Sequence, residues 1–168
     1  QDLRLSDNPA LCEAAQRGKV LPIYILDDEN SADHRMGAAG RFWLHHSLIA
    51  LDKTLNHNLS LYVGGPLSIL VKLTEFYGVK TVFWNRCYEP WRIKRDKHIR
   101  AQLKSRQIQV CSYNGSLLWK PWNTVKRDGT SYKVFTPFYR KGCQGCPAPR
   151  RPMAKPETVH LCKDIYTM

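Results

Sequence analysis

An α/β domain, built as a doubly wound parallel sheet with helices on both faces, is the fold that this sequence predicts. Between residues 9 and 113, short apolar runs rich in β-branched residues alternate with longer segments whose leucines recur at helical spacing. Glycines separate several of these segments. The chain has 168 residues, which is the length of one ordinary domain and a tail.

Capping residues and periodicity predict the individual elements. Asn8 followed by Pro9 is typical of a helix start, and Gly18 ends that first helix. The continuous apolar run 20–26 is typical of a strand buried on both faces, and the polar segment 27–38 predicts a loop. The remaining predicted elements are helix 40–57, strand 59–63, helix 67–77, strand 79–84, helix 89–106 and strand 108–113.

The alternation stops after the last of these strands. Residues 125–134 predict a hairpin around an Asp-Gly turn, and Thr136 begins a short aromatic helix that ends at Gly142. The segment after it is rich in proline and basic residues, which predicts a linker. We therefore expect a domain over residues 1–142 and a linker over residues 143–168 that leads toward a further, helical domain.

The charge balance indicates a polyanionic partner. Lysine and arginine number 26 against 14 acidic residues, a net charge of +12, so nucleic acid is the first candidate and an acidic membrane surface the second. No apolar run is long enough to span a bilayer. Six cysteines are too few and too irregular for a disulfide scaffold, and we expect a cytoplasmic protein.

Several classes of site are disfavoured by the residues present. The chain has no phosphate-binding glycine motif, which argues against a kinase, an ATPase or a nicotinamide dehydrogenase. His45 and His46 have no nucleophile motif beside them, so we expect no catalytic residue. Cys143 and Cys146 have zinc-ligand spacing, but no second such pair follows, and we expect no metal site. A ligand would bind at the carboxyl edge of the sheet.

Four blocks of sequence carry a family resemblance. They are Asp2-Leu3-Arg4-Leu5-Ser6-Asp7-Asn8-Pro9-Ala10-Leu11, Arg41-Phe42-Trp43-Leu44-His45-His46-Ser47-Leu48, Asn85-Arg86-Cys87-Tyr88-Glu89-Pro90 with Arg95-Asp96, and Tyr132-Lys133-Val134-Phe135-Thr136-Pro137-Phe138. In this order and spacing they resemble the signatures of the DNA photolyase and cryptochrome family, and a class I-like bacterial deoxyribodipyrimidine photolyase in particular.

The resemblance implies a Rossmann-like sheet of five parallel strands in the order 3-2-1-4-5. In the family the first and central strand precedes the block that here begins at Asp2, and this chain begins at Gln1. We therefore expect a fragment without strand 1. Because its neighbouring strands would then expose unpaired backbone groups, we expect the isolated chain to be unstable or to aggregate.

The resemblance also implies a function. In the family this domain binds an antenna chromophore, which absorbs light and passes the excitation to reduced FAD in a separate helical domain that repairs pyrimidine dimers in DNA. We expect FAD only in that further domain, and no repair by this chain alone. Two alternatives stay open: a cryptochrome blue-light receptor domain, and a stand-alone nucleotide-binding α/β domain.

The resemblance and the sheet-edge rule together give seven candidate antenna-binding residues. They are Asp27, Asp28, Arg41, Asn85, Cys87, Glu89 and Trp91. The resemblance leaves the identity of the antenna open among the folate, deazaflavin, flavin and lumazine types. Folate-binding relatives have an Asn-Glu pair where Trp91 and Arg92 stand, and deazaflavin-binding relatives have an acid at the position of Cys87. The competing interpretation is that Glu89 and Arg95 form an ion pair within the structure at the sheet end.

The expected partner is UV-damaged DNA, which the full-length protein would bind. We expect that protein to be a monomer and not to bind a membrane. Arg150 and Arg151 of the linker are candidate phosphate contacts. The basic residues of helix 89–106, among them Arg100, are interpreted as a solvated face.

Overall fold

The strands form two parallel pairs in the computed structural model, which describes residues 2–30 and 35–166. The strands are β1 (Ile23–Leu26), β2 (Ser60–Val63), β3 (Thr81–Asn85) and β4 (Gln109–Tyr113). β1 pairs with β2 and β3 pairs with β4, and no ladder joins β1 to β3 within the described residues.

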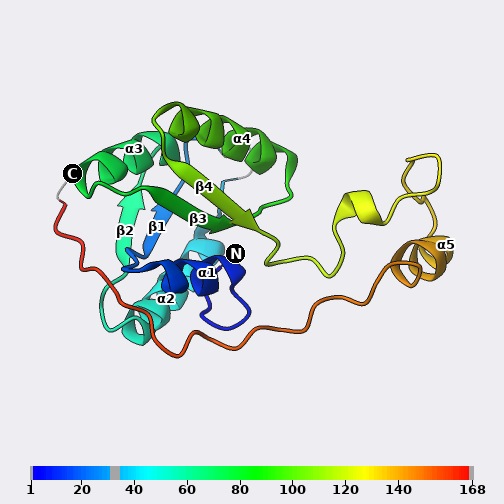
Figure 1. The fold of residues 1–168 in the computed structure, drawn as a ribbon, viewed down its shortest axis with the longest axis horizontal. Coiled ribbons are helices and arrows are strands. Elements are labelled where there is room, and N and C mark those ends of the chain that lie inside the picture. The colour runs from blue at the N-terminus through cyan, green and yellow to red at the C-terminus, as the bar shows by residue number, and fades with distance from the viewer. Residues whose placement is uncertain (1, 31–34, 167–168) are drawn as a thin grey trace.

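Each predicted helix is present within a few residues of its expected ends. The long helices are α1 (Pro9–Arg17), α2 (Ala38–Thr54), α3 (Pro66–Phe76) and α4 (Pro90–Ser105). The Asn8 side chain accepts a hydrogen bond from the Leu11 backbone N–H at 3.2 Å, which caps α1 as the sequence predicts. Helices and parallel strands alternate along the chain (Figure 1), and the predicted α/β class is confirmed.

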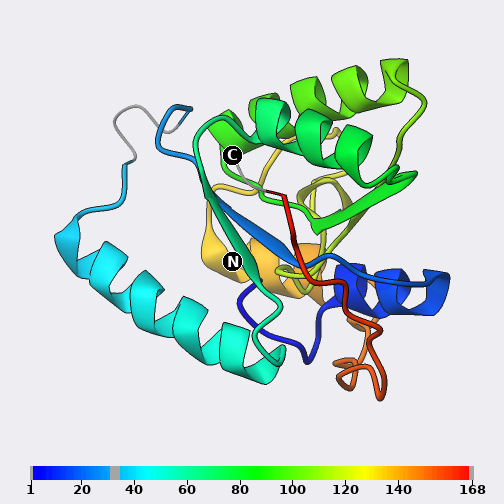
Figure 2. The ribbon, with the colours of Figure 1, turned by 90° about the vertical axis from the view of Figure 1, so that its left-hand side faces the viewer.

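One helical layer covers a shared face of both strand pairs. Leu70 of α3 and Leu103 of α4 belong to a buried cluster, and Ile23 of β1 and Val82 of β3 pack against it. Figure 2 shows α3 and α4 side by side on this face, with α1 on the opposite side of the strands. The apolar layer, rather than a continuous sheet, therefore holds the two pairs together.

α2 is packed much less closely than α3 and α4. Of its described residues Leu44 is buried, whereas Phe42 and Trp43 are 67% and 76% exposed. In Figure 2 the helix lies across the strands from α3 and α4. None of the helices in the described ranges combines the length and the apolar character that a bilayer crossing requires.

The region after β4 corrects one sequence-based prediction. The expected hairpin over residues 125–134 forms its turn, in which the Gly129 N–H donates to the Lys126 carbonyl at 2.9 Å, but no strands flank it. Asp128 instead accepts hydrogen bonds from the backbone and hydroxyl of Thr130. Residues 114–143 form an arm. Its short helical segments are η2 (Pro121–Asn123), α5 (Phe135–Pro137) and η3 (Phe138–Cys143). The arm projects to the right in Figure 1.

The segment after η3, predicted as a linker, returns along the domain (Figure 1, orange to red). The Asp7 N–H donates to the Met153 carbonyl at 2.8 Å, and Val20 forms a parallel bridge with Leu161. The predicted division at residue 142 thus separates two parts that contact each other over much of the tail.

Asp164 anchors the end of this tail. Its carboxylate accepts hydrogen bonds from the hydroxyls of Tyr62 and Tyr77, the latter at 2.5 Å. Burial raises the pKa of the Asp164 carboxyl, but these hydrogen bonds outweigh it and the pKa lies below the ordinary value of 3.8. Burial and the Asp164 contact raise the pKa of Tyr62, so that its hydroxyl stays a donor.

Candidate functional site

An ion pair joins the carboxyl end of β1 to α4. Asp27 directly follows β1, and its side chain is only 5% exposed. The Arg95 guanidinium lies 3.1 Å from the Asp27 carboxylate, which also accepts hydrogen bonds from the backbone and amide of Asn30. A buried carboxylate with this many donors is held in a fixed position.

Arg95 has a second carboxylate partner and an aromatic one. Its guanidinium lies 2.8 Å from Asp96 and 5.3 Å from the centroid of the Trp91 ring. Burial lowers the pKa of Arg95, but Asp96 and Asp27 outweigh burial and raise the pKa above its ordinary value. Arg95 is therefore paired within the protein, but its partners are these two aspartates and not Glu89, which lies beside Arg92.

Arg92 forms a cluster with Cys87, Glu89 and Trp91, and in the part of the chain that the structure describes its Nε has no hydrogen-bond acceptor. Its guanidinium is 5.0 Å from the Trp91 ring centroid and donates to the Cys87 Sγ at 3.4 Å. Its Nε lies 3.9 Å from the Glu89 carboxylate and, among the described residues, is the one buried side-chain polar atom that has no hydrogen-bond partner. Such an atom needs an acceptor, since burying it alone costs about 1–3 kcal/mol.

Two other candidate residues connect the loop after β1 to α2. The Arg41 guanidinium lies 2.7 Å from the Asp28 carboxylate, and its Nε donates to the Met36 carbonyl at 3.0 Å. The Arg41 side chain is 41% exposed, so this ion pair lies at the solvent-exposed margin of the site. It fixes the start of α2 relative to the strand end.

Asn85 has a structural position at the end of β3. Its amide donates to the Asn8 side chain at 2.8 Å, and its carbonyl accepts from the Ala10 N–H at 3.2 Å. A Cβ at Gly115 would lie 2.7 Å from the Asn85 side chain, so this close approach requires glycine. Asn85 is 5% exposed and holds α1 against β3.

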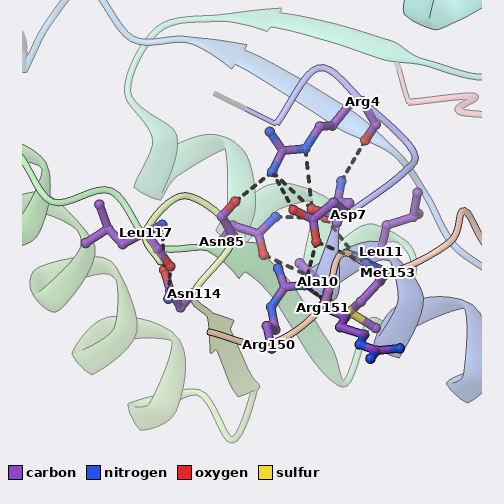
Figure 3. A network of polar contacts seen from close by, with 12 residues as sticks. Arg4, Asp7, Ala10, Leu11, Asn85, Asn114, Leu117, Arg150, Arg151 and Met153 are labelled. Atoms are coloured by element: carbon purple, nitrogen blue, oxygen red, sulfur yellow. Dashed lines mark hydrogen bonds and ion pairs between the residues drawn. The ribbon is translucent and has the colours of Figure 1, made fainter. Parts of the chain in front are cut away.

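Figure 3 shows how this region connects to the tail. Arg4 donates to the Gly115 carbonyl at 2.6 Å, and the Arg150 guanidinium lies 2.5 Å from the Asp7 carboxylate. The hydrogen bond from Arg150 lowers the pKa of Asp7. Arg150, a candidate DNA contact, is thus paired within the chain, although both Arg150 and Arg151 are exposed.

The structure brings most, but not all, of the predicted antenna residues together. Asp27, Cys87, Glu89 and Trp91 are linked through Arg95 and Arg92. Two open cavities, of about 460 and 440 Å³, lie elsewhere on the domain, and neither is lined by any of the seven candidates. Sequence reasoning missed the role of Arg92, whose signal was a cation directly after an aromatic residue at a helix start.

The comparisons with known proteins agree with one another. The family model described as DNA photolyase matches residues 1–157. A deoxyribodipyrimidine photo-lyase of Agrobacterium fabrum is 39% identical over 163 residues, which cover 95% of this chain and 33% of that protein. Cryptochrome-2 of Arabidopsis thaliana is 34% identical over 145 residues, which cover 84% of this chain and 24% of that protein.

Solved structures give the same result at the level of the fold. A bacterial class III photolyase from Agrobacterium tumefaciens superposes with a TM-score of 0.86 at 35% identity, over 97% of this chain and 34% of that one. A Synechocystis cryptochrome, at 20% identity, superposes with a TM-score of 0.82 over 99% of this chain and 36% of that one. The chain spans about a third or less of the length of these relatives.

Proposed function

The chain belongs to the DNA photolyase family, and on that premise we propose that it is the light-harvesting domain of a DNA photolyase. The parent protein repairs UV-induced pyrimidine dimers in DNA with light and reduced FAD, and the FAD is bound by a part of the protein outside this domain. The sequence suggested a class I-like enzyme. The likeness to the Agrobacterium tumefaciens structure favours a class III-like one instead.

The observation that supports an antenna site is the Arg92 guanidinium beside the Trp91 ring, on a side chain that is 29% exposed at the carboxyl edge of the strands. An aromatic heterocycle with a ring carbonyl would accept a hydrogen bond from this guanidinium and offer an apolar face to the indole. Folate, deazaflavin, flavin and lumazine chromophores all offer such an oxygen. When bound, the chromophore absorbs light and transfers the excitation to the flavin.

The remaining candidates have supporting positions around that contact. Asp27 fixes Arg95, and Arg95 in turn covers the Trp91 ring. The Cys87 thiol and the Glu89 carboxylate adjoin the Arg92 guanidinium. Asp28 and Arg41 would close the rim, and Asn85 would act through the position of α1. In this arrangement Arg92 and Trp91 contact the chromophore and the others position them.

Binding of a chromophore would be tested with the protein expressed from its complete gene. Each of the four chromophore classes is added to the purified protein, and the absorption that stays bound after gel filtration is measured. We expect one class to bind, and Arg92→Leu to lower its affinity about tenfold, the equivalent of one charge-assisted hydrogen bond. Lys94→Leu, which removes an exposed cation from the same helix, is the matched control. The absence of a bound absorption band for every class would refute the antenna site.

A cryptochrome blue-light receptor is the second candidate function. The observation in its favour is the 34% identity to Arabidopsis thaliana cryptochrome-2. Illumination of the full-length protein with dimer-containing DNA separates the two: loss of dimers supports the photolyase, and intact dimers with a light-dependent flavin signal support the receptor.

The cellular setting follows from the same proposal. All six cysteines are free thiols, which suits a reducing compartment such as the cytoplasm. We place the protein there as a monomer that meets UV-damaged DNA. Arg151, which is exposed, is the better of the two predicted phosphate contacts, because Arg150 is paired with Asp7.

A further inference from the structure

Two guanidinium groups converge on one neutral oxygen at the carboxyl end of β4. The Nε of Arg86 donates to the Ser112 hydroxyl at 3.1 Å, and Arg100 of α4 donates to the same oxygen. A second nitrogen of Arg86 donates to the Ser112 carbonyl at 2.8 Å. In the described part of the chain, neither arginine forms an ion pair with a carboxylate. The two guanidinium groups carry like charges and repel each other at this separation. An anion bound nearby would offset that repulsion.

An open cavity of about 460 Å³ is lined by Arg86 and by Ser112, the residue that both arginines contact. It lies at the carboxyl ends of β3 and β4, the edge of a parallel sheet at which ligands bind. Its volume is within the range of about 300–1,000 Å³ found for small-molecule sites. The residues that line it and bear on its chemistry are Arg86, Ser112, Tyr113, Trp119, Lys120 and Arg150.

The lining is positively charged, and its charge is not balanced locally. It contains no aspartate or glutamate. Of its cations, Arg150 is paired with Asp7, whereas Lys120 contacts the Trp122 ring at 5.9 Å and no carboxylate in the described ranges. Arg86 and Lys120, with Arg100 behind Ser112, therefore leave an excess of positive charge facing the cavity.

An aromatic ring is part of the same wall. The Trp119 indole N–H donates to the Pro147 carbonyl at 3.0 Å, which fixes the ring against the returning tail. Because the tail is itself held at Asp7 through Arg150, the wall is ordered by contacts distant in sequence. A fixed indole next to unpaired cations is the combination that binds a base and its phosphate together.

We propose that this cavity binds a nucleotide, with the phosphate on Arg86 and Lys120 and the base against Trp119. The site shares no residue with the cluster around Trp91, so it is a second ligand site, independent of the antenna. The nucleotide is either free or the phosphorylated end of a nucleic acid strand, because both present the same group.

The test uses isothermal titration of the full-length protein with AMP, adenosine and inorganic phosphate. AMP is expected to bind at least tenfold more tightly than adenosine, because adenosine lacks the phosphate. Arg86→Met is expected to weaken AMP binding about tenfold, as the loss of a charge-assisted contact does. Lys94→Met removes an exposed cation of α4 that does not line the cavity and is expected to leave binding unchanged.

Three results would overturn the proposal: no AMP binding, equal binding of adenosine, or equal effects of the Arg86 and Lys94 substitutions. Lys120→Met, checked for native circular dichroism, serves as a second variant in case Arg86→Met disturbs the end of β3. A 5′-phosphorylated single-stranded oligonucleotide that displaces AMP identifies a nucleic acid end as the source, and one that does not identifies a free nucleotide. Retained chromophore absorption in all variants separates this site from the antenna.

Discussion

Two groups of arginines lie at the carboxyl edge of the strands and differ in what surrounds them. Arg95 lies between Asp27 and Asp96, with a side chain that is 20% exposed. Arg86 and Arg100 share the hydroxyl of Ser112 and contact no carboxylate in the described residues. The first group is neutralised within the protein, and the second is not.

This difference separates a structural use of charge from a binding use. A buried cation between two carboxylates stabilises the folded state as long as both partners remain, because any partner left alone would be a desolvated charge. Cations that converge on a neutral oxygen gain little stability from one another and keep their capacity to bind an anion. Measurements of stability and of anion binding for both groups of arginines test this difference.

The largest expected effect is on stability at Arg95. Arg95→Met leaves the Asp27 carboxylate, 5% exposed, without its ion-pair partner, and we expect a loss of about 3 kcal/mol in the free energy of unfolding. Arg100→Met is the matched variant and is expected to change that free energy by less than about 0.5 kcal/mol. The free energies of unfolding of both variants are measured by urea unfolding and by hydrogen exchange of the α4 amides. Similar losses for the two variants would contradict the distinction.

The next effect concerns the two tryptophans of this edge. Trp91→Leu is expected to weaken chromophore binding about tenfold and to leave AMP affinity unchanged, while Trp119→Leu is expected to do the reverse. Each variant is the control for the other, since both replace a partly buried indole. Absorption of bound chromophore and titration with AMP are the two measurements. A substitution that alters both ligands equally would mean that the two sites are one.

The smallest effect concerns the tail and is pH-dependent. The folded-state pKa of Asp164 lies below 3.8, so its contribution to anchoring is present above that pH and is lost as the pH falls through the lower, folded-state value. Limited proteolysis by pepsin should therefore cleave the tail faster as the pH falls below about 3.8. Asp164→Asn removes the titrating group, and in that variant this step in the pH profile is expected to disappear. An unchanged step would assign it to another carboxylate.

The helices, the strands and their parallel arrangement were predictable from local patterns. The Asn8-Pro9 start of α1 and the apolar periodicity of α3 depend on neighbouring residues, and the structure contains both as expected. The hairpin over residues 125–134 was wrong beyond its turn, because strand formation there needs a paired partner that the Asp-Gly signal does not specify.

The candidate site was predictable in location and less so in detail. The rule that ligands bind beyond parallel strand ends correctly placed Asp27, Glu89 and Trp91 at one edge. Asn85 was predicted to face a ligand, but its amide bonds to Asn8 and Ala10, a contact that depends on how α1 packs. Arg92 was missed, because burial of one nitrogen without a partner is a property of the packed structure.

The sequence by itself determined the order and type of the elements and, through four short blocks, the family, because these depend on capping, periodicity and residue identity along the chain. The tertiary structure decided which charges are matched. Asp27 and Arg95 are 68 positions apart, and Arg86 and Ser112 are 26 apart. No local pattern encodes contacts between residues so far apart in the sequence, because such contacts form only when helices and strands pack together.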